Sequence, residues 1–305
     1  MKNKNIQFII FLVVFVVMLD FTLGNIYDSL YFSDKSRNND RLVHSVLETN
    51  EDILIFGSSR AIHHYNPKII QDSLNLTCYN VGVNGQNIYF HLALLKSAVE
   101  RNKPKIAILD LFSIDFKETS SKNDKENLSV LLPFTNRSES SLSTVLLRGK
   151  SESIKLKSFI YPFNSLQYQI LRNNFHPFNN SYQGFIPIHK EYKGDLEVKT
   201  IKNRPFDNIK MSALYEFIEL CKEKNIELFI FVSPSYLTNT GTSNYMIITD
   251  KIKNKFDLNV NSFQNDSLFL KNPQYFSDPG HLNSIGADIY TTLAVETIKK
   301  NMFGK

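Results

Sequence analysis

The chain has 305 residues, of which 42% are hydrophobic and 21% charged, proportions typical of a folded protein. Its net charge of +5 is spread along the sequence rather than gathered in a basic stripe, which argues against a nucleic-acid partner. The two cysteines, Cys78 and Cys221, lie in apolar segments and have no partners at metal-ligand spacing. We therefore expect buried free thiols, no disulfide framework and no metal site.

The first residues have the features of a signal anchor. Lys2 and Lys4 precede an apolar run over residues 6–23, in which Asp20 is the one charged residue. As a helix this run is about 27 Å long, barely enough to span a bilayer. No small-x-small cleavage site follows, so we expect an uncleaved transmembrane helix over 1–24, with a cleaved signal and a secreted protein as the alternative. The lysines place the N-terminus in the cytoplasm and the remainder of the chain outside it.

Residues 25–50 are polar and predict a stalk, after which strands and helices alternate over 51–305. The expected strands lie at 52–56, 77–81, 105–111, 227–232 and 258–261. The expected helices lie at 67–74, 88–101, 211–224, 247–253 and 282–301. Such alternation is typical of a parallel sheet covered by helices on both faces.

The alternation is interrupted at about 116–205, where Asn, Ser, Lys and aromatic residues dominate. A stretch of this length is unusual for a loop, so we expect an insertion or lid beside the functional site, with short helices near 143–147 and 166–171. The predicted fold is an α/β, three-layer α/β/α sandwich with a parallel, flavodoxin-like sheet, preceded by one N-terminal transmembrane helix.

The loop after the first strand contains Gly57-Ser58-Ser59-Arg60. Ligands of parallel sheets bind beyond the carboxyl ends of the strands, so a serine here can face a substrate. The alternative is that Ser58 or Ser59 merely caps the helix that follows, which serine does often.

A second candidate segment, Ser277-Asp278-Pro279-Gly280-His281, precedes the last helix. The turn through Pro279 and Gly280 can direct the Asp278 carboxylate at the His281 imidazole. The other ring nitrogen could then take the proton of a serine hydroxyl, which is a weak nucleophile without a base. The alternative is that Asp278 serves the turn and His281 is incidental.

Together these segments resemble the SGNH (GDSL) hydrolase family, in its membrane-anchored, extracytoplasmic branch. Gly57-Ser58-Ser59-Arg60 is similar to the family's nucleophile block with Ser in place of Asp, and Asp278-Pro279-Gly280-His281 to its Asp-x-x-His block. Asn80-Val81-Gly82-Val83-Asn84-Gly85 resembles the block that carries the oxyanion-hole glycine. The resemblance implies Ser59, His281 and Asp278 as the catalytic residues, and Ser59 and Gly85 as backbone donors of the oxyanion hole.

This chain departs from the family's pattern at the third block. The family places an asparagine after the third strand as a further oxyanion donor, whereas this chain has Leu109-Asp110-Leu111-Phe112-Ser113-Ile114-Asp115. Removing one such donor costs about 10²–10³ in rate. Asn84 or Asn87 are the alternative side-chain donors, and we expect Asp110 and Asp115 to be structural.

The resemblance implies an extracytoplasmic serine esterase or O-acyltransferase that acts on an acylated carbohydrate or cell-envelope polymer, with no cofactor. The alternative is an inactive SGNH-like binding or assembly protein of the cell envelope, which the departure at the third block favours. Arg137, Arg148, Lys150 and Arg172 of the insertion could line a polymer groove, but solvated surface charges are the simpler interpretation.

Overall fold

A computed structural model describes residues 2–118, 121–195, 197–199, 205–239 and 244–303. Its centre is a five-stranded parallel sheet with the strand order β2-β1-β3-β5-β7. The strands are β1 (Ile53–Phe56), β2 (Cys78–Asn80), β3 (Ile106–Asp110), β5 (Glu227–Val232) and β7 (Val260–Ser262). All five expected strands are therefore confirmed: the first three are one or two residues shorter than expected, the fourth has the expected bounds, and the last is shifted toward the C-terminus.

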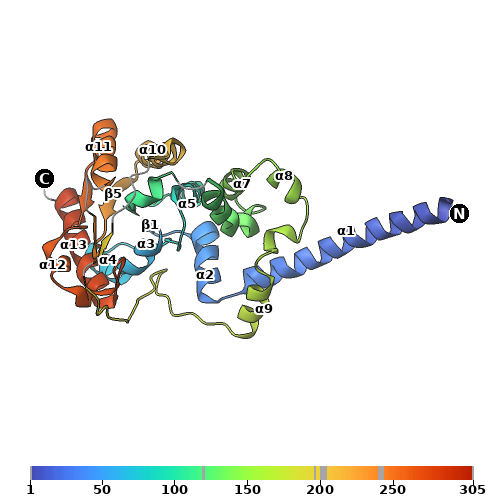
Figure 1. Cartoon of the computed structure of the whole chain (residues 1–305), viewed down its shortest axis with the longest axis horizontal. Helices are drawn as coiled ribbons and strands as arrows, with labels where there is room; N and C mark the ends of the chain where they lie inside the picture. The colour runs from blue at the N-terminus through green and yellow to red at the C-terminus, as the bar shows by residue number, and fades with distance from the viewer. Residues whose placement is uncertain (1, 119–120, 196, 200–204, 240–243, 304–305) are drawn as a thin grey trace.

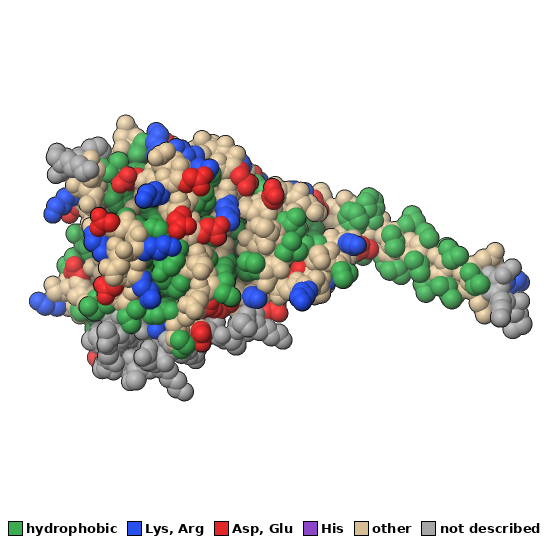
Figure 2. Space-filling model, turned by 90° about the horizontal axis from the view of Figure 1, so that it is seen from above, with side chains coloured by type: hydrophobic (Ala, Val, Ile, Leu, Met, Phe, Trp, Pro, Cys, Tyr) green, Lys and Arg blue, Asp and Glu red, His purple; other side chains and the backbone are tan. Residues whose placement is uncertain are grey.

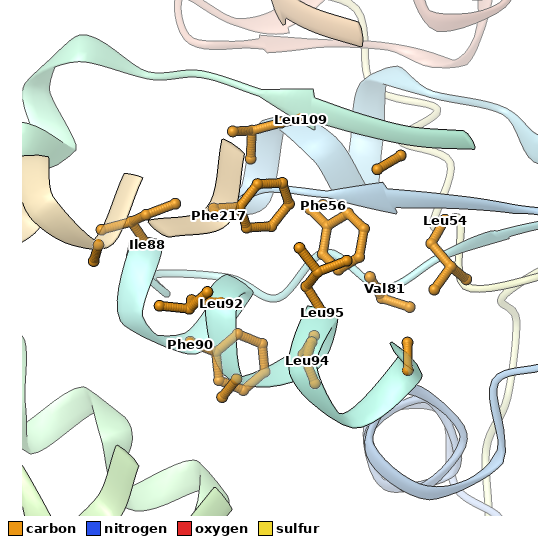
Figure 3. Close-up of a cluster of buried hydrophobic side chains, with 14 of the residues drawn as sticks. Leu54, Phe56, Val81, Ile88, Phe90, Leu92, Leu94, Leu95, Leu109 and Phe217 are labelled. Atoms are coloured by element: carbon orange, nitrogen blue, oxygen red, sulfur yellow. The ribbon is translucent and has the colours of Figure 1, made fainter. Parts of the chain in front are cut away.

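Helices cover both faces of the sheet because its central strands are apolar on both sides. Every residue of β1 and β3 is buried. Alternate residues of β1 point to opposite faces, so that Leu54 and Phe56 join one apolar cluster and Ile53 and Ile55 the other. Figure 3 shows the first cluster, in which α5 (Ile88–Arg101) and α10 (Asn208–Glu223) cover the sheet. The other face is covered by α3 (Ser59–His64), α4 (Pro67–Leu74) and α13 (Ser284–Phe303).

The N-terminal helix α1 (Lys2–Ser33) projects from the globular body, as Figure 1 shows. It is long and apolar enough to cross a membrane, a criterion of length and composition alone. Hydrophobic side chains cover the projecting part in Figure 2, whereas the body carries charges of both signs. The exposed large apolar residues of this helix extend from Ile6 to Phe21, and Ile26 is exposed as well.

The segment over 25–50, expected to be a stalk, contains the end of α1, then α2 (Arg37–Val43) and the π-helical turn η1 (His44–Glu48). Tyr31, Val43 and Val46 of this segment are buried in the cluster that covers one face of the sheet. The segment thus packs against the domain over much of its length.

The expected insertion at 116–205 is described except for residues 119–120, 196 and 200–204. It consists of short helices: the end of η2 (Ser113–Phe116), α6 (Ser121–Glu126), η3 (Asn127–Phe134), α7 (Glu139–Leu146), α8 (Glu152–Lys155), η4 (Tyr161–Phe163) and α9 (Gln167–Phe175). Leu128, Leu131, Phe134, Val145 and Phe163 are buried in the same cluster as Leu54 and Phe56. The insertion therefore extends the core on one face of the sheet.

The insertion ends with β4 (Glu197–Lys199), which pairs with β6 (Leu237–Asn239). The elements after β6 are α11 (Asn244–Phe256), α12 (Ser267–Leu270), η5 (Pro273–Tyr275), and the hairpin of β8 (Phe276–Asp278) and β9 (His281–Leu282), with β7 between α11 and α12. Because β9 contacts both α3 and α13, the C-terminal candidate segment lies next to the helix that follows β1.

Candidate functional site

Ser59 is the first residue of α3, directly beyond the carboxyl end of β1. Gly57 makes the turn with φ of 146°, a backbone conformation that side chains disfavour. A Cβ added there would also come within 2.8 Å of the Ala61 Cβ, so glycine is required for α3 to approach the strand. Ser58 is the residue before the helix and makes no side-chain capping hydrogen bond. Capping therefore does not account for either serine.

The β8–β9 hairpin holds the Asp278 carboxylate beside Nδ1 of the His281 ring. One carboxylate oxygen accepts hydrogen bonds from the backbone N–H groups of Gly280 (2.8 Å) and His281 (3.0 Å). Both oxygens lie 3.0 Å from His281 Nδ1. Burial would raise the pKa of Asp278, but the hydrogen bonds from His281 and Gly280 outweigh it and lower the pKa below its usual value.

The other nitrogen of the ring, Nε2, lies 2.8 Å from the Ser59 hydroxyl. Because an ionised carboxylate only accepts hydrogen bonds, Nδ1 carries the proton that is donated to Asp278. Neutral His281 then has a free lone pair on Nε2, to which the Ser59 hydroxyl donates. The three side chains predicted from the sequence thus form one chain of hydrogen bonds, although Ser59 and His281 are 222 residues apart. We call the set of Ser59, His281 and Asp278 the relay.

A cavity of about 310 Å³ opens beside the Ser59 hydroxyl. Its wall combines the start of α3, the turn at Gly85, the segment after β3, Lys210 of α10 and the β8–β9 hairpin. Ser59 N–H has no acceptor within α3, because the first N–H groups of a helix lack an intrahelical partner. Gly85 lies in a turn with φ of 69°, and a Cβ there would meet nothing within 4 Å. Gly85 lines the cavity, and its carbonyl accepts a hydrogen bond from the Asn127 amide at 3.1 Å.

The two asparagines considered as alternative donors lie in different places. Asn84 is exposed and does not line the cavity. Asn87 does line it, but its side-chain oxygen accepts from Tyr89 N–H to cap α5 and its amide donates to the Asp124 carbonyl at 3.2 Å. Since an amide nitrogen has two protons, Asn87 retains one for a ligand.

The segment after β3 contributes Phe112 and Asp115 to the cavity wall. Burial raises the pKa of Asp115 to about 7. The positive charges of Arg60 and Lys210 oppose this rise in pKa. The negative charges of Asp110 and Asp124 add to it. We expected Asp115 to be structural, but it lines the cavity. Its pKa near 7 is a feature that the sequence pattern did not indicate.

Beneath the cavity lies a buried polar network centred on Ser233, which follows β5. The Ser233 hydroxyl donates to Asp110 (2.9 Å) and accepts from Arg60 Nε (3.0 Å) and from His64 Nδ1 (2.9 Å). Arg60 also donates to the Ser233 carbonyl. Sequence reasoning missed Ser233, although its position at the carboxyl end of a strand was the available signal.

The neighbouring histidine on α3 and the remaining residues considered in the sequence lie outside the relay. His63 directs Nδ1 at the Ile186 carbonyl, 2.7 Å away. Cys78 and Cys221 are buried free thiols, as expected. Among the described residues, no group of His, Cys, Asp or Glu side chains is arranged to hold a metal ion. The four basic residues of the insertion do not line the cavity, and Arg137 and Arg148 pair with Asp28 and Glu152 respectively.

No protein-family model matches the sequence, and no curated protein matches it significantly.

Asp115 predicts a pH-dependent component of stability. A carboxyl with a folded pKa near 7 binds more protons in the folded than in the unfolded chain, where its pKa is ordinary, so it destabilises the fold as pH rises from about 4 to about 7. Asp115→Asn removes this titration. We expect the variant to gain on the order of 4 kcal/mol in free energy of unfolding relative to wild type across that range. Denaturant unfolding of the full chain in detergent at a series of pH values measures it.

Asp257→Asn is the matched control. Its carboxyl accepts a hydrogen bond from Lys253, which lowers its pKa below 3.8, so it titrates below the range tested. Parallel stability curves for wild type and Asp115→Asn between pH 4 and 7 would contradict the prediction.

Ser233→Ala tests the buried network. The change leaves Asp110, Arg60 and His64 each without one hydrogen-bond partner, and we expect it to lower the free energy of unfolding by about 1–3 kcal/mol. Ser262→Ala, on the exposed strand residue that pairs with Val232, is the control and should cost less than about 0.5 kcal/mol. Equal stabilities of the two variants in chemical denaturation would show that the network contributes nothing.

Proposed function

We propose that this chain is a serine esterase or O-acyltransferase of the SGNH type, anchored by α1 with its globular domain outside the cytoplasm. The observation that carries the proposal is the relay of Ser59, His281 and Asp278, with separations of 2.8 Å and 3.0 Å. The segment around Ser59 and the segment around His281 are each ambiguous alone. In the fold they come together with the nucleophile, base and carboxylate in the geometry that nucleophilic catalysis needs.

In the proposed reaction, Ser59 Oγ attacks the carbonyl carbon of an ester while His281 Nε2 takes the hydroxyl proton. The Asp278 carboxylate stabilises the resulting imidazolium through Nδ1. Backbone N–H groups of Ser59 and Gly85 hold the oxyanion of the tetrahedral intermediate. Its collapse breaks the ester bond, and His281 returns the proton to the departing alcohol. Water or a second hydroxyl, deprotonated by His281, then attacks the acyl-serine, which gives hydrolysis or transfer.

Three further features support the family proposal. The strand order β2-β1-β3-β5-β7 is that of flavodoxin-like, doubly wound sheets. The relay lies beyond the carboxyl ends of the strands, where ligands of such sheets bind. The turn that contains Gly85 follows β2 and reaches the same cavity. We accordingly assign residues 51–305 to one SGNH-like domain.

The size of the cavity suggests the kind of substrate. A volume of about 310 Å³ is near the lower limit for small-molecule sites, so it suits a short acyl group and the adjoining part of its carrier. An anchored domain meets polymers of the cell envelope, and we propose an acylated carbohydrate of this kind as the substrate. No step of the reaction requires a cofactor.

One observation favours a binding protein without activity as the second candidate. Phe112 and Asp115, rather than an asparagine, occupy the cavity wall after β3. A missing oxyanion donor reduces the rate of acyl transfer by about 10²–10³. A slow or absent reaction would leave a domain that binds the acylated polymer.

Turnover of a chromogenic acetate ester by the full chain in detergent tests the proposal. We expect Ser59→Ala and His281→Ala to abolish turnover, and Asp278→Asn to lower kcat/KM by about 10⁴-fold because the imidazolium loses its counter-charge. Ser181→Ala, at a half-buried position, and His176→Ala, at an exposed one, both lie outside the cavity wall and should retain wild-type rates. Turnover that survives in Ser59→Ala would overturn the assignment of the nucleophile.

A further inference from the structure

The insertion is joined to α1 near the end of the apolar run over residues 6–23. Asp20 lies in that run, directly after Leu19, and its carboxylate accepts three hydrogen bonds from one short stretch of the insertion. The donors are the Ser158 hydroxyl (2.6 Å) and the backbone N–H groups of Phe159 (2.9 Å) and Ile160 (3.2 Å). The only acidic residue of the apolar run is therefore paired with the protein.

Further contacts next to Asp20 hold α1 and the insertion close together. We call this contact region the junction. The rings of Phe21 and Phe159 pack edge to face with centroids 5.0 Å apart. A Cβ on Gly24 would come within 2.4 Å of the Phe159 Cβ, so glycine is needed for the helix to pass the insertion. One turn further on, Arg137 of the insertion forms two hydrogen bonds with Asp28, of 2.8 Å and 2.6 Å. The anchor and the insertion thus form one unit.

The length of the apolar run sets the depth of this junction. A helix needs about 20 residues to cross the hydrocarbon core of a bilayer, which is about 30 Å thick. At 1.5 Å per residue, Asp20 lies about 24–27 Å along the helix from Lys4 and Lys2, so with both lysines in one headgroup layer Asp20 lies near the opposite boundary of the core. A carboxylate at that depth requires hydrogen-bond partners. The stretch that supplies them must lie at the same depth.

The surface around this stretch suits a lipid boundary. We define residues 146–160 as the juxtamembrane segment. Its exposed apolar side chains include Ile154, which is 68% exposed, and Phe159, which is 48% exposed. Its exposed basic residues are Lys150, Lys155 and Lys157. Its one glutamate, Glu152, is buried and paired with Arg148 and Lys155. Apolar side chains flanked by lysines are typical of segments that bind at the membrane interface.

We propose that the juxtamembrane segment lies on the bilayer surface beside the anchor. Ile154 and Phe159 then lie among the parts of the acyl chains next to the headgroups, and the lysines lie at the lipid phosphates. This inference rests on the membrane anchoring in the proposed function. It adds that the domain is seated on the membrane in one orientation, rather than tethered at a distance. In Figure 1, α13 lies at the end of the body opposite the projecting part of α1, so it faces away from the bilayer.

The absence of tryptophan from the sequence gives a direct test, because one introduced tryptophan is then the sole indole in the chain. Three exposed apolar residues are replaced one at a time: Phe11→Trp in the anchor, Ile154→Trp in the juxtamembrane segment and Ile285→Trp on α13. Each full-length variant is reconstituted in phosphatidylcholine vesicles with and without brominated acyl chains. The bromine atoms lie near the headgroup end of the chains for Ile154→Trp and Ile285→Trp, and near the bilayer centre for Phe11→Trp, because Phe11 lies near the middle of the apolar run. Bromine quenches indole fluorescence only on close approach. Ile285 is 60% exposed, which makes it a matched control for Ile154.

We expect brominated lipid to reduce the fluorescence of Phe11→Trp and Ile154→Trp and to leave that of Ile285→Trp unchanged. Quenching of Phe11→Trp alone would overturn the seating of the domain while the anchor remained. Loss of quenching in both Phe11→Trp and Ile154→Trp would remove the anchoring on which the inference rests. Equal quenching of Ile154→Trp and Ile285→Trp would also overturn it, because the contact would then not be specific to the juxtamembrane segment.

Discussion

His64 connects the two halves of the candidate site through its two ring nitrogens. It lies on the same short helix as Ser59, and its Nε2 accepts the backbone N–H of Leu282, the residue after His281, at 3.0 Å. Its Nδ1 donates to Ser233 at the end of β5. The bond from Leu282 requires the neutral ring, because a protonated Nε2 cannot accept, and burial secures that form by lowering the pKa of His64 well below 6.5. The short distance between Ser59 and His281 therefore depends on a third residue that takes no part in the proposed reaction.

The sequence predicted the sheet and the relay because both have local signals. Short apolar runs that end in Gly57, Gly82 or Asp110 indicate buried parallel strands, and loops after such strands converge on one edge. The Asp278–His281 spacing likewise lies within one turn, so its geometry is local. Ser59 and His281 could be paired only through a resemblance to a family, since their contact spans 222 residues.

Other parts of the structure have no local signal. The insertion is built from short helices whose apolar residues follow no sustained period, yet Leu128 and Phe134 belong to the core around Leu54. The network of Ser233 with Asp110 and Arg60 depends on long-range contacts, as does the high pKa of Asp115. The polar composition of residues 25–50 led us to expect a stalk. That composition does not reveal that Tyr31 and Val46 are buried in the domain. Burial of this kind is set by tertiary packing, which a single sequence does not display.

The central claim is that Ser59 is a nucleophile, and a covalent adduct tests it most directly. The full chain and its Ser59→Ala variant are incubated with an activated acetyl ester, and intact mass is measured before peptide mapping. The account predicts one acetyl group on the wild-type chain, mapped to Ser59 and absent from the variant. Equal masses for the two chains, with no adduct and no ester turnover, would contradict it and leave a binding domain as the better description.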